Sequence, residues 1–356
     1  MQKKRRLERN KRKGKKQMQN MDKRRGKQSV VFDSRPRVAG FASVAGTKEM
    51  QGPLGHTFDE TFTDDYLGRE SWEKAETAML ERTIDLALAK AGLFAGQVDV
   101  MLAGDLLNQI VTAGYAARGL GIPFLGLYGA CSTMAESLML GAMLIDGGFC
   151  QSAVCAASSH FATAERQYRF PLEMGAQRPP TAQWTVTGAG ATVLHREKGL
   201  NIAVECATMG RVADVGQKDL NNMGAAMAPA AADTLLTHLN DMGRGLDDYD
   251  LIATGDLGNV GSQLLRQLCQ REGLHLDHRC IDCGSEIYTS AQDVHAGGSG
   301  CGCSAVCLNG WLMQRMLRGD VKRLLLIATG AMMSPTTSLQ GESIPSIAHA
   351  VSLEVI

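Results

Sequence analysis

Cys131 is the residue whose setting most favours chemistry. It lies in the segment Tyr128-Gly-Ala-Cys-Ser-Thr-Met134, after a short apolar run at residues 122–127 and before a stretch rich in Ala, Gly, Leu and Met. This pattern predicts a strand, a turn of small residues and a helix that begins near Cys131. Free backbone N–H groups and the helix dipole favour a thiolate at such a position, which suits a covalent nucleophile. A small buried cysteine is the competing interpretation.

Other cysteines raise the question of a metal site. Cys280 and Cys283 are separated by two residues, and Cys301 and Cys303 follow them, which approaches the spacing of four zinc ligands. The second pair is separated by one residue only, so the match is poor. The glycines of residues 297–302 are not followed by the lysine of a phosphate-binding loop. We therefore predict no metal and no cofactor.

Internal repeats indicate the elements that position Cys131. Residues 98–108 resemble residues 249–259 at an offset of 151, and Cys131 recurs as Cys303 at an offset of 172. The first pair has the pattern of buried strands that end in a polar turn, and the second that of turns that open a helix. Two matches in the same order predict duplication. Strands alternating with helices predict an α/β fold with parallel sheets covered by helices, with a site where equivalent turns of the two halves meet.

The composition is that of a soluble globular protein. Of 356 residues, 44% are hydrophobic and 21% are charged, so a large core can form without disulfides. No apolar run reaches the length of a membrane span, and we expect no secretory signal because the N-terminus lacks an apolar segment. Ten cysteines scattered in apolar or Gly-rich surroundings favour a reducing compartment.

The net charge of zero hides a strong asymmetry. Residues 1–28 hold 14 Lys and Arg against two acidic residues, so the rest of the chain is acidic. Such a segment cannot pack a core and predicts a disordered arm. The predicted organisation is a basic arm at residues 1–28, an N-terminal half at 29–198 and a C-terminal half at 199–356.

Long segments of the chain carry a family resemblance, from about Gln28 to the C-terminus. The repeated order and the Gly-Ala-Cys-Ser turn resemble the thiolase superfamily, which includes ketoacyl synthases. More narrowly, the chain is similar to the stage V sporulation protein AD family of spore-forming bacteria. The segments that carry this similarity are Gly52-Pro-Leu-Gly-His56, Leu102-Ala-Gly-Asp-Leu-Leu-Asn-Gln109, Tyr128-Gly-Ala-Cys-Ser-Thr133, Ser158-Ser-His160, Thr163-Ala-Glu-Arg-Gln-Tyr-Arg169, Ala225-Ala-Met-Ala-Pro-Ala-Ala-Ala-Asp233, Ala296-Gly-Gly-Ser-Gly-Cys301 and Ile347-Ala-His349.

The resemblance implies a thiolase-like duplicated fold, layered αβαβα, with two pseudo-equivalent halves. It also implies a protein that binds dipicolinic acid and acts in the uptake of that compound into the developing spore, with a link to spore germination. The implied partners are other SpoVA proteins, and the implied location is the cytoplasmic side of the forespore or spore inner membrane, as a peripheral protein. Members of the family are not regarded as condensing enzymes.

The residues at the expected catalytic positions agree with a silent site. Condensing enzymes resembling ketoacyl synthase III place a His at the end of the second-half strand and an Asn in a later Gly-rich turn. Here Asp256 holds the first position, and residues 296–303 contain no Asn. A carboxylate near Cys131 also disfavours its thiolate. The alternative is an active acyltransferase that uses Cys131, with His295 or His349 as a substitute base.

A dipicolinate site needs donors for two carboxylates on a flat pyridine ring, and arginine suits carboxylates. Arg166, Arg169 and Arg178 lie in a long polar segment, although they could instead pair with Glu165 and Glu173 or line a subunit interface. The predicted ligand-binding residues are Cys131, Ser132, Ser159, His160, Arg166, Arg169, Asp256 and His349.

Further partners follow from the fold and the arm. We expect a homodimer in which the strand that ends near Ala157 offers its edge and residues 158–187 reach across. The arm can hold the acidic body at an anionic membrane surface, unless translation begins at Met21. We expect no specific nucleic acid, because the arm lacks aromatic residues that stack on bases.

Overall fold

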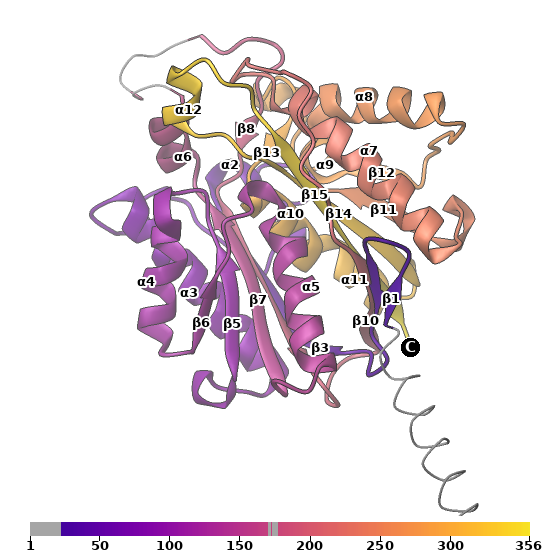
Figure 1. Ribbon diagram of the computed structural model, residues 1–356. Helices are drawn as coiled ribbons and strands as arrows, with labels where there is room; N and C mark the ends of the chain where they lie inside the picture. The colour runs from indigo at the N-terminus through magenta and orange to yellow at the C-terminus, as the bar shows by residue number, and fades with distance from the viewer. Residues whose placement is uncertain (1–22, 170–171, 173–176) are drawn as a thin grey trace, which may run out of the picture.

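The computed structural model describes residues 23–169, 172 and 177–356 (Figure 1). The arm predicted at residues 1–28 therefore lies largely outside the described residues. Its last part is folded, because strand β1 (Arg24–Arg25) pairs with β2 (Ser29–Val31), and β2 pairs with β10 (Ile202–Thr208). The predicted boundary at residue 28 is thus too late, and this basic hairpin belongs to the body.

The two halves arrange their strands in the same way. The spatial order is β3-β9-β7-β5-β6 in the first half and β10-β15-β14-β11-β12 in the second, which is one order when strands are counted along each half. The halves join where Arg37 of β3 pairs with Ala203 of β10. The remaining bounds are β3 (Arg37–Ala45), β5 (Val100–Gly104), β6 (Phe124–Gly126), β7 (Ser152–Ser159), β9 (Gly188–His195), β11 (Leu251–Thr254), β12 (Cys280–Asp282), β14 (Arg323–Ala331) and β15 (Ser346–Val355).

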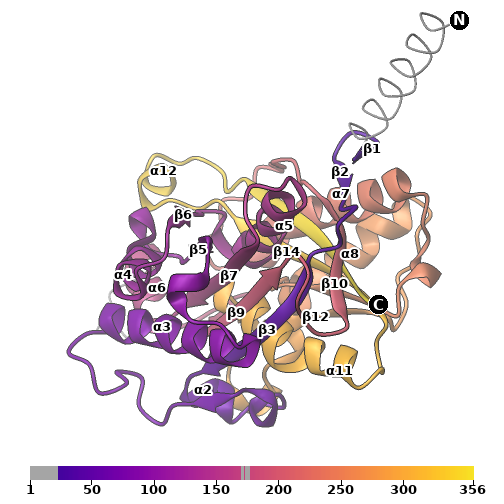
Figure 2. The same ribbon diagram turned by 90° about the horizontal axis from the view of Figure 1, so that it is seen from below.

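Helices cover both half-sheets and fill the space between them (Figures 1 and 2). Helices α3 and α4 cover the first half, α7 and α8 cover the second, and α5 and α10 lie in the middle layer. Three buried apolar clusters match the contacts between layers. The predicted layered αβαβα fold is confirmed. The helices are α3 (Trp72–Ala91), α4 (Val111–Leu120), α5 (Thr133–Asp146), α7 (Met223–Met242), α8 (Gly258–Arg271), α10 (Cys301–Val306) and, after a π-helical turn (Cys307–Leu312), α11 (Met313–Leu317).

Local sequence signals determine the ends of the two long outer helices. Helix α3 begins after Ser71, whose hydroxyl accepts the Lys74 N–H, and ends at Gly92 with φ of 66°. Helix α7 begins after Asn222, whose side chain also caps the first turn, and ends at Gly243 with φ of 63°. Polar N-caps and left-handed glycines are the usual helix boundaries. The matching caps give the two halves outer helices of the same length.

Short elements complete the chain around the carboxyl ends of the strands. No helix among the described residues is both long and apolar enough to cross a membrane. All ten cysteines are buried and free, and no group of metal-ligating side chains is present in the described residues. The short elements are α2 (Thr47–Met50), β4 (Glu60–Thr61), α6 (Phe161–Tyr168), β8 (Trp184–Thr185), α9 (Cys283–Glu286), β13 (Gly298–Ser299) and α12 (Pro335–Leu339).

The strand predicted to form the dimer edge lies inside the sheet. It is β7, which ends at Ser159 and pairs with β5 on one side and β9 on the other. That prediction is wrong, because a strand with two neighbours has no free edge. The outer strand of the first half is β6, where the Leu125 side chain is 50% exposed.

Candidate functional site

A strained turn presents Cys131 at the end of the middle layer. Residues 130–132 form a single 3₁₀ turn between β6 and α5, and Ala130 has a φ of 50°. The Ser132 hydroxyl donates to the Gly129 carbonyl at 2.7 Å, and the Thr133 hydroxyl donates to the Ala130 carbonyl at 2.7 Å. A left-handed conformation is uncommon for a residue other than glycine and persists only when its surroundings hold it. The two hydroxyls hold this turn.

Cys131 faces a buried carboxylate. Its thiol donates a hydrogen bond to Asp256, and burial together with the Asp256 charge raises the pKa of Cys131 well above its usual value. Asp256 also accepts from the Thr329 hydroxyl at 2.7 Å, the Gly300 N–H at 3.0 Å and the Ser299 hydroxyl at 3.3 Å. Burial raises the pKa of Asp256 to about 6. The expectation that the helix start favours a thiolate is therefore wrong, since desolvation and Asp256 outweigh the dipole.

The repeated Gly-Asp motif explains how Asp256 reaches Cys131. Asp256 follows β11, and its counterpart Asp105 follows β5 at the equivalent position of the first half. Asp105 accepts the backbone N–H groups of Leu107 at 2.8 Å and Ala113 at 2.7 Å, so it organises the turn before α4. Asp256 instead binds side chains and backbone at the interface between the halves. The two aspartates thus occupy equivalent positions in the two halves, but different surroundings give them different contacts.

Cys131 lines a cavity of about 260 Å³, and among the described residues one charged side chain lies in its wall. That side chain is Arg169, which directly follows α6. Polar groups of Asn108, Tyr128 and Tyr168 also face the cavity. Thr185, Ser299 and Ser334 line it as well, and the apolar part of the wall comprises Leu106, Ala130, Ala164, Met223, Ala331, Met332 and Met333.

Arg169 is buried and only partly paired. Its side chain is 7% exposed and forms an ion pair with Glu165, whose side chain is 10% exposed. Within the described residues, the Arg169 Nε atom is buried and has no hydrogen-bond partner. An unpaired buried N–H of a charged group is costly, so an acceptor that reached this atom would be stabilising.

Arg166 and Arg178 do not line the cavity. Arg166 is half exposed and pairs with Glu73 on the surface. Arg178 donates to the Gln183 carbonyl and lies over the Trp184 ring, with its carbon 5.0 Å from the ring centroid. Of the two acidic partners considered from sequence, Glu165 pairs with Arg169, whereas Glu173 lies outside the described residues.

The other predicted ligand-binding residues are buried behind the cavity. The His160 Nδ1 atom accepts the Ala162 N–H at 3.2 Å and caps α6, and Ser159 accepts the Gly302 N–H at 3.0 Å. His349 Nδ1 accepts the Gly210 N–H at 3.1 Å, and burial lowers the pKa of His349 to about 4. Ser132 and Asp256 act through the Cys131 turn. Among the eight predicted residues, the structure brings Cys131 and Arg169 to the cavity wall.

Sequence reasoning missed Asn108, Tyr128 and Tyr168. Asn108 and Tyr128 fall within the segments that carry the family resemblance, so the sequence indicated their turns but not that their side chains line the cavity. Tyr168 precedes Arg169 at the end of α6, and a signal for its contact across the chain to the Leu106 carbonyl was absent from the sequence.

Comparisons with known proteins agree on one family and one fold. The family model described as Stage V sporulation protein AD (SpoVAD) matches residues 26–354. Stage V sporulation protein AD of Bacillus subtilis (strain 168) is 48% identical over 329 residues, which are 92% of this chain and 97% of that protein. Two thiolase-like structures show the same fold at low identity. Human mitochondrial 3-ketoacyl-CoA thiolase in complex with CoA has a TM-score of 0.57 at 14% identity and covers 91% of this chain and 98% of that one. The 3-oxoacyl-[acyl-carrier-protein] synthase III of Aquifex aeolicus has a TM-score of 0.54 at 13% identity, with coverage of 90% and 99%.

Proposed function

The chain belongs to the stage V sporulation protein AD family, a family of sporulation proteins with a thiolase-like fold, and on this premise we propose that it binds dipicolinic acid in the cavity beside Cys131. The observation that carries the proposal is that Arg169 lines the cavity and that its buried Nε atom has no hydrogen-bond partner among the described residues. A carboxylate is the acceptor that best matches an arginine N–H in a desolvated site. The flat pyridine ring then lies against the apolar wall.

The protonated thiol of Cys131 supports binding without catalysis. Acyl transfer needs a thiolate and a base that accepts its proton. The thiol instead donates to Asp256, which has three other donors, and its pKa lies well above neutrality. The position of Cys131 on a thiolase-like fold keeps acyl transfer as the second candidate. An acyl-enzyme mass shift with acyl-CoA or malonyl-CoA that is lost in Cys131→Ser would establish that alternative.

Calorimetric titration of the full chain with dipicolinate tests the proposal. We expect binding, and we expect Arg169→Gln to weaken it about tenfold or more, because the variant loses a hydrogen bond between charged groups. Arg166→Gln is the matched control, since Arg166 lies in α6, three residues before Arg169, but pairs with Glu73 at the surface. No heat of binding at millimolar dipicolinate, or equal losses in both variants, refutes the proposal.

We propose that this binding serves uptake of dipicolinate into the developing spore, together with other SpoVA proteins at the cytoplasmic side of the inner membrane. The 14 Lys and Arg of residues 1–28, a segment whose last part belongs to the body, support a peripheral position, because each Lys or Arg near an anionic surface contributes about 1 kcal/mol before screening. Co-sedimentation with anionic vesicles tests this role. The full chain should bind more than a version that begins at Met21, and equal binding by both forms contradicts it.

We also propose a homodimer, now through the edge of β6 rather than β7. A free edge strand pairs readily with a second copy, and β6 carries Leu125, which is 50% exposed. Light scattering should give a dimer mass that Leu125→Glu reduces. Phe149→Glu is the control, because Phe149 is 82% exposed in the turn before β7. A monomeric wild type contradicts the proposal.

A further inference from the structure

We propose that the end of the first half opposite the cavity is a docking surface for anionic lipid, in which Phe94 and Phe149 enter the headgroup region and neighbouring cations contact the headgroup phosphates. This inference rests on the peripheral position proposed above and adds a folded surface to the basic arm. The surface lies at the amino ends of β5 and β7, whereas the carboxyl end of β7 leads into α6. Figure 1 shows α6 and α12 at the upper end of the molecule, with β1 and the C-terminus towards the lower end.

Two exposed phenylalanines lie at this end. Phe94 is 66% exposed in the turn before β5, and Phe149 is 82% exposed in the turn before β7. The two turns are joined, because the Ser152 hydroxyl donates to the Gln97 carbonyl at 3.1 Å. A single exposed apolar side chain is normal on a protein surface. Here two aromatic side chains occupy adjoining turns at one edge of the molecule.

The second half provides an internal comparison for these two turns. Val100 of β5 pairs with Ala153 of β7 in the same way as Leu251 of β11 pairs with Leu324 of β14. Corresponding residues are therefore 151 positions apart at β5 and β11, and 171 positions apart at β7 and β14. The turns that precede these strands can be compared residue by residue at the same offsets.

Neither phenylalanine has an aromatic counterpart. Gly245 corresponds to Phe94, and Asp320 corresponds to Phe149. Asp320 pairs with Arg318 at 3.1 Å, so the second half presents a neutralised ion pair where the first half presents an apolar ring. The same turns form without the aromatic side chains, which indicates that the fold does not require them. Their exposure on one half favours a role in contact with a partner.

A cationic turn borders Phe149. This turn joins β9 to β10, and the Arg196 backbone N–H donates to the Gln151 carbonyl at 2.9 Å, directly beside the Phe149 turn. Lys198 is exposed in the same turn. Among the described residues, neither cation forms an ion pair with a carboxylate. Glu197 is exposed between them, so the three residues keep one net positive charge.

The basic hairpin adds charge next to the same turn. Lys23 pairs with Asp146 at 2.5 Å, at the end of α5 and three residues before Phe149. Arg24 and Lys27 are exposed at the hairpin and have no carboxylate partner in the part of the chain that the structure describes. The 22 residues before Lys23 hold ten more Lys and Arg. The arm therefore joins the body at this surface, and both favour an anionic partner.

A lipid surface is the partner that matches both kinds of side chain. Phenylalanine side chains lie favourably at the boundary between headgroups and acyl chains, and Lys and Arg are attracted to anionic headgroups. A purely basic surface would suit any polyanion, whereas exposed aromatic rings among the cations need an apolar layer beneath the charge. In this orientation the cavity at the opposite end faces the aqueous phase, where a soluble ligand can reach it.

Co-sedimentation of the full chain with vesicles tests the aromatic part. The vesicles contain equal parts of phosphatidylglycerol and phosphatidylcholine, and pure phosphatidylcholine is the reference. We expect Phe94→Ser and Phe149→Ser each to lower the partition coefficient about tenfold, because burial of a phenylalanine side chain contributes at least that factor. Leu339→Ser is the matched control and should have no effect, since Leu339 is 89% exposed on α12 at the cavity end.

The cations should differ from the phenylalanines in their response to salt. Arg196→Gln and Lys198→Gln should each lower partition about fivefold at low salt. Added salt should remove this difference by screening and leave the phenylalanine effect in place. Lys218→Gln is the matched control, because Lys218 is an exposed cation that contacts the Gly341 carbonyl, just after α12.

A depth measurement identifies the residue that enters the lipid. Brominated lipid should quench the added fluorescence of Phe149→Trp in anionic vesicles, and should not quench that of Leu339→Trp. Equal quenching of the two overturns the proposed orientation. Thermal unfolding that matches the wild type confirms that each variant is folded.

The outcomes separate this inference from the proposals on which it rests. Vesicle binding that depends on the arm, but is the same in the phenylalanine variants as in Leu339→Ser, overturns the docking surface and leaves the role of the arm intact. Equal binding to both kinds of vesicle overturns the requirement for anionic lipid. No binding of the wild type to anionic vesicles overturns both membrane proposals, while dipicolinate binding is measured independently of lipid.

Discussion

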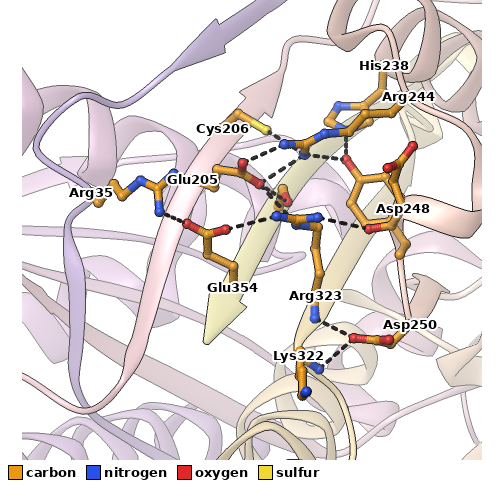
Figure 3. Close-up of polar contacts among 12 residues, drawn as sticks. Arg35, Glu205, Cys206, His238, Arg244, Asp248, Asp250, Lys322, Arg323 and Glu354 are labelled. Carbon is orange, nitrogen blue, oxygen red and sulfur yellow. Dashed lines mark hydrogen bonds and ion pairs between the residues drawn. The ribbon is translucent and has the colours of Figure 1, made fainter. Parts of the chain in front are cut away.

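Replacing Arg244 by Met should destabilise the fold without affecting the cavity, because Arg244 neutralises a buried glutamate far from it. Glu205 sits at a bulge of β10 between Val204 and Cys206, and its side chain is 8% exposed. Arg244 donates a hydrogen bond to each carboxylate oxygen of Glu205, at 2.9 Å and 2.5 Å (Figure 3). Arg323 lies 3.6 Å from the same carboxylate. The bulge directs this side chain towards the two arginines.

The magnitude follows from the burial of Glu205. Removing one partner of a buried ion pair leaves a charge without compensation and costs about 3–5 kcal/mol. Arg323 and the Ser352 hydroxyl, at 3.2 Å, still contact Glu205 in the variant. We therefore expect the low end, about 3 kcal/mol. Arg244 also donates to the Tyr249 hydroxyl at 3.0 Å, and the Met variant loses that hydrogen bond as well.

Equilibrium urea unfolding measures the loss, and a double variant tests its cause. Glu205→Leu combined with Arg244→Met removes both charges, so the loss should shrink to about 1 kcal/mol or less. The arginines hold the pKa of Glu205 below its usual value, so its stabilisation is present above an unfolded pKa of 4.5 and is lost as the pH falls through the lower folded value. A double variant that is less stable than either single variant refutes the reasoning, as does a single-variant loss that persists at low pH.

Three further predictions concern buried groups. Burial raises the pKa of Glu49 to about 7, so protonated Glu49 stabilises the fold fully below pH 4.5, and this contribution is lost as the pH rises through 7. The melting temperature should therefore increase when the pH is lowered from about 8 to about 6, and it should increase less in Glu49→Gln. Asp256→Asn removes the charge beside Cys131, and iodoacetamide should then alkylate that thiol about threefold faster for each unit by which its pKa falls, because the thiolate fraction rises while its nucleophilicity falls. An unchanged rate contradicts the assigned cause. A Cβ at Gly330 would lie 2.3 Å from a backbone oxygen of the Cys131 turn, so Gly330→Ala should cost about 2 kcal/mol in urea unfolding, whereas Gly114→Ala in open space should not.

The fold could be predicted because duplication leaves a trace in the sequence. The offset of 151 matches β5 with β11, and the offset of 172 matches Cys131, in the 3₁₀ turn before α5, with Cys303, in the first turn of α10. Each repeated segment contains a strand end and a turn, which local residue types specify. The edge of the sheet could not be predicted in this way. The run that forms β7 is longer and more apolar than β6, yet pairing partners, not strand length, decide which strand lies outside.

The sequence predicted the turn that carries Cys131, but it did not predict which other side chains line the cavity. Arg166 and Arg169 are three residues apart and chemically identical, so residue types alone could not distinguish them. Helix α6 ends at Tyr168, and Arg169 leaves the helical conformation with φ of −123° and ψ of −84°. That change turns Arg169 inward, while Arg166 stays on the outer surface. A helix end is among the least certain features of a sequence pattern, and here it determines which arginine is buried.

The position of Asp256 links the silent chemistry to binding. In a thiolase-like site the group beside the cysteine must take a proton, whereas a carboxylate beside a buried thiol raises the pKa of the thiol and keeps it protonated. Asp256 is held by Thr329, Ser299 and the Gly300 N–H, so it cannot turn away to release the thiol. The thiol is thereby held protonated and hydrogen-bonded, and within the described residues the Arg169 Nε atom has no hydrogen-bond partner. This state supports the proposal that the protein binds a diacid that enters and leaves intact, and it does not support condensation.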